Sequence, residues 1–138
     1  MNSIERLTTG ELAKRSAVNV ETIRYYERQR LLPRPPRSSS GYRLFPSESI
    51  DRIRFIKQAQ ELGFSLKEIK DLLALRIDPH STSAEVRNRA EAKIIDIDEK
   101  IETLRSMRRA LERLTAACKG RGSAAECPIL GNLSSERK

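Results

Sequence analysis

The stretch from Ser83 to Cys118 constrains the fold most, because it contains neither glycine nor proline. Apolar side chains recur along it at intervals of three and four residues, which is typical of a long helix with one apolar stripe in a heptad-like repeat. A helix of this length would be roughly 50 Å long at 1.5 Å per residue. The small remainder of the chain cannot cover such a stripe, and it offers no second long helix. We therefore expect a coiled coil with a second copy, hence a homodimer. The stripe consists of Val86, Ala90, Ile94, Ile97, Ile101, Leu104, Met107, Leu111, Leu114 and Cys118.

Residues 9–30 fit two short helices joined by a tight turn. Thr9 is expected to cap the first helix, which continues to Ser16, and residues 17–20 supply the turn. The apolar residues Leu12, Ala13, Val18 and Ile23 can meet as the core of two crossing helices, which predicts a helix-turn-helix.

The second of these helices presents basic and aromatic side chains on its outer face. Arg24 and Arg28 are four residues apart and therefore share a face, with Tyr25 beside them. Guanidinium and phenol groups suit phosphate oxygens and base edges, so this helix is the candidate to enter DNA. The alternative is an ordinary basic surface helix whose charges are simply solvated.

A small wing is expected after the two helices. The prolines in residues 31–37 exclude a helix, Ser38–Gly41 is turn material, and Tyr42–Phe45 alternates like a short strand. Residues 1–8 are expected to form a loose arm. Two further helices follow, one beginning at Pro46 with a C-cap at Gly63, and one with a capping box formed by Ser65 and Glu68. The apolar face of the first should comprise Ile50, Ile53, Phe55, Ile56 and Leu62.

Four runs of residues resemble the MerR family of transcriptional regulators, in order and at fitting spacings: Ile23–Glu27, Leu31–Pro33, Gly41–Phe45 and Leu62–Ile69. The resemblance implies a mainly α fold: a winged helix-turn-helix DNA-binding domain (1–75), a linker (76–82), an antiparallel dimerisation helix (83–118) and a C-terminal metal-binding loop (119–138). It also implies a dimer on promoter DNA that acts on RNA polymerase by distorting the promoter. The DNA-binding roles then fall on Arg15, Thr22, Arg24, Tyr25, Arg28, Arg37, Tyr42 and Arg43.

The charge distribution agrees with a nucleic-acid partner. The formal net charge is +8, and residues 1–60 hold 12 Lys and Arg against 6 Asp and Glu. A membrane surface is the competing partner for a basic protein. No long apolar run or signal peptide is visible, so we expect a soluble, cytoplasmic protein without membrane contact. An enzyme is not expected, because His80 is the one histidine and no Cys–His or Ser–His arrangement is visible.

The two cysteines, Cys118 and Cys127, flank a flexible loop after the long helix. Gly120 and Gly122 allow a tight turn there, and Pro128 is expected to begin a short helix whose positive end lowers the pKa of Cys127. Thiolates select soft ions such as Cu(I) and Zn(II) over Mg(II) or Ca(II). Two buried thiols and a redox pair remain the alternatives.

The resemblance places metal ligands at these two cysteines and a selectivity position at Ser83. Divalent-ion sensors of the family carry a third cysteine there, and sensors of coinage metals carry serine. Ser83 therefore favours Cu(I), Ag(I) or Au(I), because Zn(II) would be short of ligands, and a Zn(II)-, Cd(II)- or Pb(II)-responsive regulator remains an alternative. The eight residues between the cysteines instead resemble the divalent sensors, and two-coordinate Hg(II) remains a rival. His80 could supply a nitrogen, although a lone linker histidine is more often just exposed.

Overall fold

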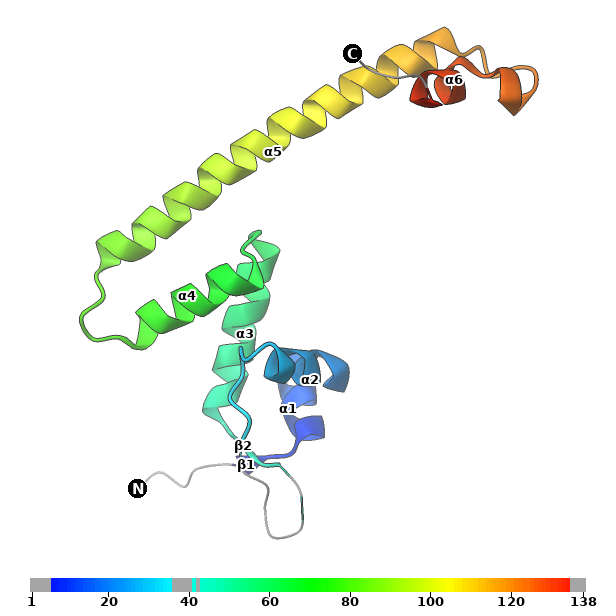
Figure 1. The fold of residues 1–138 in the computed structure, drawn as a ribbon. Coiled ribbons are helices and arrows are strands. Elements are labelled where there is room, and N and C mark those ends of the chain that lie inside the picture. The colour runs from blue at the N-terminus through cyan, green and yellow to red at the C-terminus, as the bar shows by residue number, and fades with distance from the viewer. Residues whose placement is uncertain (1–5, 36–40, 42, 135–138) are drawn as a thin grey trace. The chain divides into compact units, whose positions relative to one another are not determined.

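The computed structural model describes residues 6–35, 41 and 43–134 (Figure 1). The chain divides into two compact units, one ending at Ala90 and one beginning at Glu91. The elements, in order, are β1 (Arg6–Leu7), α1 (Thr9–Ser16), α2 (Val20–Arg28), β2 (Phe45–Pro46), α3 (Glu48–Glu61), α4 (Leu66–Ile77), α5 (Ser83–Ala117), the 3-10 turn η1 (Ala124–Glu126) and α6 (Pro128–Ser134). This is the expected mainly helical chain. No described helix is both long and apolar enough to cross a membrane.

The expectation of a loose arm over residues 1–8 is wrong at Arg6–Leu7, which form strand β1. β1 pairs antiparallel with β2, and Leu7 lies opposite Phe45. Both of these side chains are buried, so one leucine in a polar stretch anchors the start of the chain in the core. Of the strand expected at Tyr42–Phe45, Tyr42 lies outside the described residues and Phe45 begins β2. β2 includes Pro46, which therefore lies outside α3.

The helix caps explain where α1 and α2 begin. The N-cap of α1 is Thr8, and not Thr9, because Thr8 forms a capping box with Glu11. The Glu11 N–H donates to Thr8 Oγ1 at 3.2 Å, and the Thr8 N–H donates to Glu11 Oε1 at 3.0 Å. Asn19 caps α2 by accepting from the Thr22 N–H at 2.8 Å, so Val20 belongs to the helix.

Helix α3 ends in a Schellman motif. Gly63 has φ +93°, its N–H donates to the Gln60 carbonyl at 3.0 Å, and the Phe64 N–H donates to the Ala59 carbonyl at 3.1 Å. Leu62 is the C-cap and lines a hollow with Phe55 and Ala59, so it continues the apolar face of α3 but remains exposed. The expected capping box of Ser65 and Glu68 is confirmed at the start of α4.

The core of the first unit joins α1–α4 and both strands. Its buried apolar side chains form one cluster, with Val18, Val20, Phe55, Phe64 and Leu66 packed against it. Burial of α2 through Ile23 and Tyr26 leaves its opposite face free for contacts with a ligand. The cluster comprises Leu7, Leu12, Ala13, Ile23, Tyr26, Leu31, Leu32, Phe45, Ile50, Ile53, Ile56, Ala59, Ile69 and Leu73.

The expected long helix is confirmed as α5, whose apolar stripe is largely exposed within the single chain. Ile97 and Ile101 are 38% and 39% exposed, and Leu104 is 61% exposed. A stripe of large apolar side chains open to water indicates a surface that packs against another molecule.

Candidate nucleic-acid interface and cysteine site

Helix α2 presents the expected outer face. Arg24, Tyr25 and Arg28 are exposed, whereas Ile23 and Tyr26 point into the core. The Arg28 guanidinium lies 6.0 Å from the centroid of the Tyr25 ring, within cation–π range. Arg24 makes an exposed ion pair with Glu21 at 3.2 Å, which leaves its guanidinium free to exchange partners.

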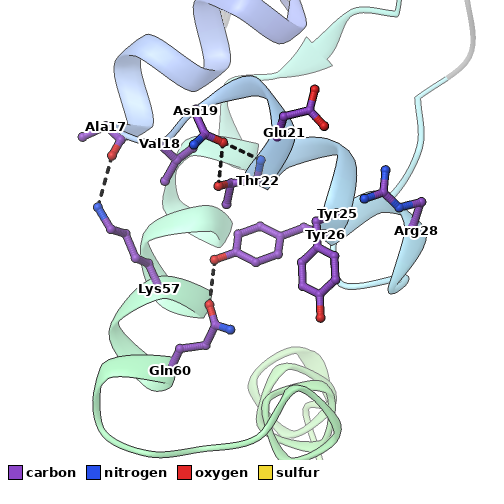
Figure 2. Close-up of a pocket in the computed structure, with 10 residues that line it drawn as sticks. All are labelled: Ala17, Val18, Asn19, Glu21, Thr22, Tyr25, Tyr26, Arg28, Lys57 and Gln60. Atoms are coloured by element: carbon purple, nitrogen blue, oxygen red, sulfur yellow. Dashed lines mark hydrogen bonds between the residues drawn. The ribbon is translucent and has the colours of Figure 1, made fainter.

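Three of the residues predicted to bind DNA line one concave face. Figure 2 shows Thr22, Tyr25 and Arg28 together with Lys57 and Gln60 from α3. The Tyr26 hydroxyl donates to Gln60 Oε1 at 2.8 Å, and Lys57 Nζ donates to the Ala17 carbonyl at 3.1 Å (Figure 2). These two bonds fix α2 and the preceding turn on α3.

Tyr26 and Gln60 are positioning residues that the sequence analysis missed. Burial raises the pKa of the Tyr26 phenol, so its hydroxyl stays protonated and able to donate. No local pattern could have revealed the pair, because the two residues are 34 positions apart.

Glu27 joins helix α2 to the segment that follows it. Its side chain is 3% exposed, and its Oε2 atom lies 3.1 Å from Arg43 Nη1 and 3.5 Å from Arg34 Nε. Arg43 was predicted as a DNA contact, but its guanidinium is partly buried in this ion pair. Its position beside β2 is therefore set by a carboxylate from α2.

Of the other residues predicted to bind DNA, the structure describes Arg15 and Thr22. Arg15 is exposed near the end of α1. Thr22 is half-buried, and its hydroxyl donates to Asn19 Oδ1 at 2.9 Å. Arg37 and Tyr42 lie outside the described residues.

The two cysteines lie next to each other after α5. Their sulfurs are 3.3 Å apart, and both thiols are free and half-buried. Gly120 and Gly122, with φ +70° and +89°, turn the chain back, and η1 then leads to Cys127 directly before α6. The left-handed backbone at both glycines is what allows so short a loop to close.

The electrostatics of the loop favour a thiolate at Cys127. A hydrogen bond from the Cys118 thiol lowers the pKa of Cys127 most, followed by a bond from the Ile129 N–H, while a weaker one comes from the Leu130 N–H. The expected lowering of this pKa therefore has a source beyond the helix end, namely the neighbouring thiol.

The donor set fits a soft ion with few ligands. A metal ion with bonds of about 2.3 Å to two sulfurs can bridge sulfurs that are up to about 4.6 Å apart, so one ion can reach both Cys118 and Cys127. For a linear arrangement, the two sulfurs would have to move about 1.3 Å further apart than their present 3.3 Å. Within the described ranges, no group of three or more His, Cys, Asp or Glu residues could hold a metal ion. His80 is exposed.

Comparison with known proteins decides the family. A family model described as MerR HTH family regulatory protein matches residues 7–75, and one described as MerR, DNA binding matches residues 50–114. The chain belongs to the MerR family. It is therefore a DNA-binding transcriptional regulator and not an enzyme.

Relatives extend this MerR assignment over the whole chain. The mercuric resistance operon regulatory protein of Serratia marcescens is 40% identical over 99% of this chain and 93% of its own. The transcription regulator PbrR691 from Ralstonia metallidurans CH34, solved in complex with lead(II), has a TM-score of 0.80 at 35% identity and covers 93% of this chain and 99% of its own. HiNmlR, a MerR family regulator solved in a complex with promoter DNA, has a TM-score of 0.57 at 25% identity and covers 82% of this chain and 86% of its own.

Proposed function

We propose that this MerR-family chain is a homodimeric regulator whose signal is a soft metal ion bound by Cys118 and Cys127. The pair of free sulfurs 3.3 Å apart carries the proposal, because two thiols held this close can share one ion. The mercuric regulator of Serratia marcescens and the lead(II) complex of PbrR691 support it, since both are similar over nearly the full chain.

The homodimer rests on α5. The side chains of Ile97, Ile101 and Leu104 lie on its stripe and are exposed in the single chain. Burying a side chain of this size contributes about 1.5–3 kcal/mol. An antiparallel pairing of α5 with its copy covers the stripe along its length.

The donor set favours Cu(I), Ag(I) or Au(I). Ser83 begins α5 where a divalent sensor would carry a third cysteine, and a serine hydroxyl stays protonated at neutral pH. Two thiolates satisfy a linear monovalent ion, whereas Zn(II), Cd(II) or Pb(II) would need further ligands. Hg(II) is the rival, supported by the eight-residue spacing of the cysteines and by the mercuric relative.

Regulation follows as a shift between two states of the dimer. A metal that binds one state more tightly raises its population, and the two states hold promoter DNA in different shapes. The energy that bends or untwists the DNA must come from contacts with it. We assign these contacts to Thr22, Arg24, Tyr25 and Arg28 of α2, and to Arg15, Arg37, Tyr42 and Arg43. RNA polymerase then reads the realigned promoter.

A reporter assay tests the proposal with the cysteines as switches. Cys118→Ser and Cys127→Ser should each abolish the metal response while binding to DNA persists. Ser83→Cys should gain response to Zn(II), and Ser83→Ala is its matched control, because it removes the hydroxyl without adding a thiol. A cysteine variant that still responds to metal would refute the assigned ligands.

A redox signal is the second candidate, favoured by the same sulfur separation. Hydrogen peroxide would oxidise both thiols to a disulfide and be reduced to two waters, with two electrons and two protons leaving the sulfurs. Thiol titration of the purified protein after exposure to peroxide, with and without bound Cu(I), separates this signal from metal binding.

A further inference from the structure

We propose that Arg28, Arg30 and Arg34 form a second phosphate-binding site, at the C-terminal end of α2, that holds the DNA backbone. The inference rests on the DNA-binding function of the chain. The three arginines line a hollow of about 510 Å³ together with Glu27, Leu32 and Pro33.

The hollow carries surplus positive charge. Of the described residues that line it, Glu27 alone is acidic, and its carboxylate is already bound to Arg34 and Arg43. Within the described part of the chain, neither Arg28 nor Arg30 makes an ion pair. The guanidinium groups of Arg28 and Arg30 therefore leave positive charge in the hollow that a phosphodiester can neutralise, with the bidentate geometry that guanidinium favours.

The backbone of Arg30 is strained at the end of α2. Arg30 has φ +60°, and it occupies the left-handed position of a Schellman motif: its N–H donates to the Glu27 carbonyl at 3.0 Å, and the Leu31 N–H donates to the Tyr26 carbonyl at 2.9 Å. Glycine is the residue favoured at this position, and a residue with a Cβ costs roughly 1–2 kcal/mol there. Ala17 shares this left-handed backbone at φ +57°, so the role of the Arg30 side chain rests on its charge and its place in the hollow, and the strain sets what a glycine there would relieve.

Arg28 connects this hollow to the recognition face. It lines the concave face in Figure 2 that Thr22, Tyr25 and Lys57 also line, and it lines the hollow of Arg30 and Arg34 as well. A DNA strand that passes along α2 can therefore place successive phosphates in the two sites. The alternative role for these arginines is a favourable interaction with the negative end of the helix, which requires no ligand.

Arg30→Gly distinguishes phosphate binding from a role at the helix end. It removes the backbone strain, which affects stability, and the positive charge, which affects DNA binding. The duplex is one that the wild-type protein selects from a random-sequence pool, and fluorescence anisotropy measures affinity over a series of KCl concentrations. We expect the melting temperature to rise, the affinity to fall roughly tenfold, and the log–log salt slope to shrink by about 0.9, the value for one phosphate.

Three further variants complete the test. Arg30→Lys should keep most of the salt slope, whereas Arg30→Asn, which tolerates the backbone without the charge, should lose it. Arg113→Gln is the matched control, because it removes one exposed positive charge from α5 and should change neither affinity nor slope.

Two results would overturn the inference while leaving DNA binding intact. One is a more stable Arg30→Gly protein with wild-type affinity and slope, which would assign Arg30 to the helix end alone. The other is weaker binding with an unchanged slope, which would indicate a change of shape. A wild-type protein that selects no duplex would instead refute the DNA-binding function itself.

Discussion

Replacing Glu27 by glutamine should loosen the junction between the recognition helix and the wing. The variant keeps the size of the side chain but loses the charge that holds Arg43 and Arg34. The Arg43 bond is 3.1 Å long and partly buried, and a hydrogen bond between charged groups contributes about 1.5–3 kcal/mol. Arg34 is 57% exposed, so solvent reduces its contribution to about 0–1 kcal/mol.

The amide of the variant can still accept one weaker bond, so we expect a net loss of about 1–2 kcal/mol in the free energy of unfolding. For a unit of this size that loss lowers the melting temperature by roughly 4–16 °C. Urea denaturation measures the loss in the free energy of unfolding. Both proteins are compared at one fixed concentration, since the stability of a dimer depends on concentration.

Glu21→Gln is the matched control on the same helix. Glu21 and Arg24 form an exposed pair, with side chains 74% and 59% exposed, so the change should stay within about 0.5 kcal/mol. A double-mutant cycle between Glu27→Gln and Arg43→Gln should show a coupling of about 1 kcal/mol. Equal stabilities of the Glu27→Gln and Glu21→Gln proteins would refute the assigned role of Glu27.

Three further changes test other parts of the chain. Ile101→Asp places a charge on the apolar stripe and should dissociate or unfold the dimer, whereas sedimentation showing an intact dimer would place the interface elsewhere. Gly63→Ala, at φ +93°, should cost about 1–2 kcal/mol in urea denaturation, and a loss below about 0.3 kcal/mol would contradict the strain argument. In Cys118→Ala, the pH midpoint for alkylation of Cys127 by iodoacetamide should move upward, because the largest cause of its lowered pKa is gone; an unmoved midpoint would count against that hydrogen bond.

Local signals in the sequence were sufficient for much of the fold. The helical spacing of apolar residues predicted α5, and the Ser65 and Glu68 pair predicted the start of α4, because each signal depends on residues within a few turns. Strand β1 was missed for the opposite reason. It is two residues long, and its partner Phe45 is distant in the sequence, so neither alternation nor a turn marks it.

The candidate site shows the same division. The outward face of α2 and the two cysteines follow from spacing, and the structure brings the sulfurs together as the loop glycines allow. The pairing of Glu27 with Arg43, by contrast, depends on how the wing folds against α2. The left-handed backbone of Arg30 was also unpredictable, because propensity favours glycine there.

The most direct test of the metal-sensing account is a competition titration of the purified, fully reduced protein with Cu(I), Hg(II) and Zn(II). We predict one Cu(I) per cysteine pair, Zn(II) binding at least a hundredfold weaker than Cu(I), which is about 2.7 kcal/mol, and loss of Cu(I) binding when Cys118 and Cys127 are both serine. Hg(II) binding tighter than Cu(I) would move the assignment to the divalent rival. Zn(II) binding as tightly as Cu(I), or metal binding that survives the loss of both cysteines, would contradict a two-thiolate sensor.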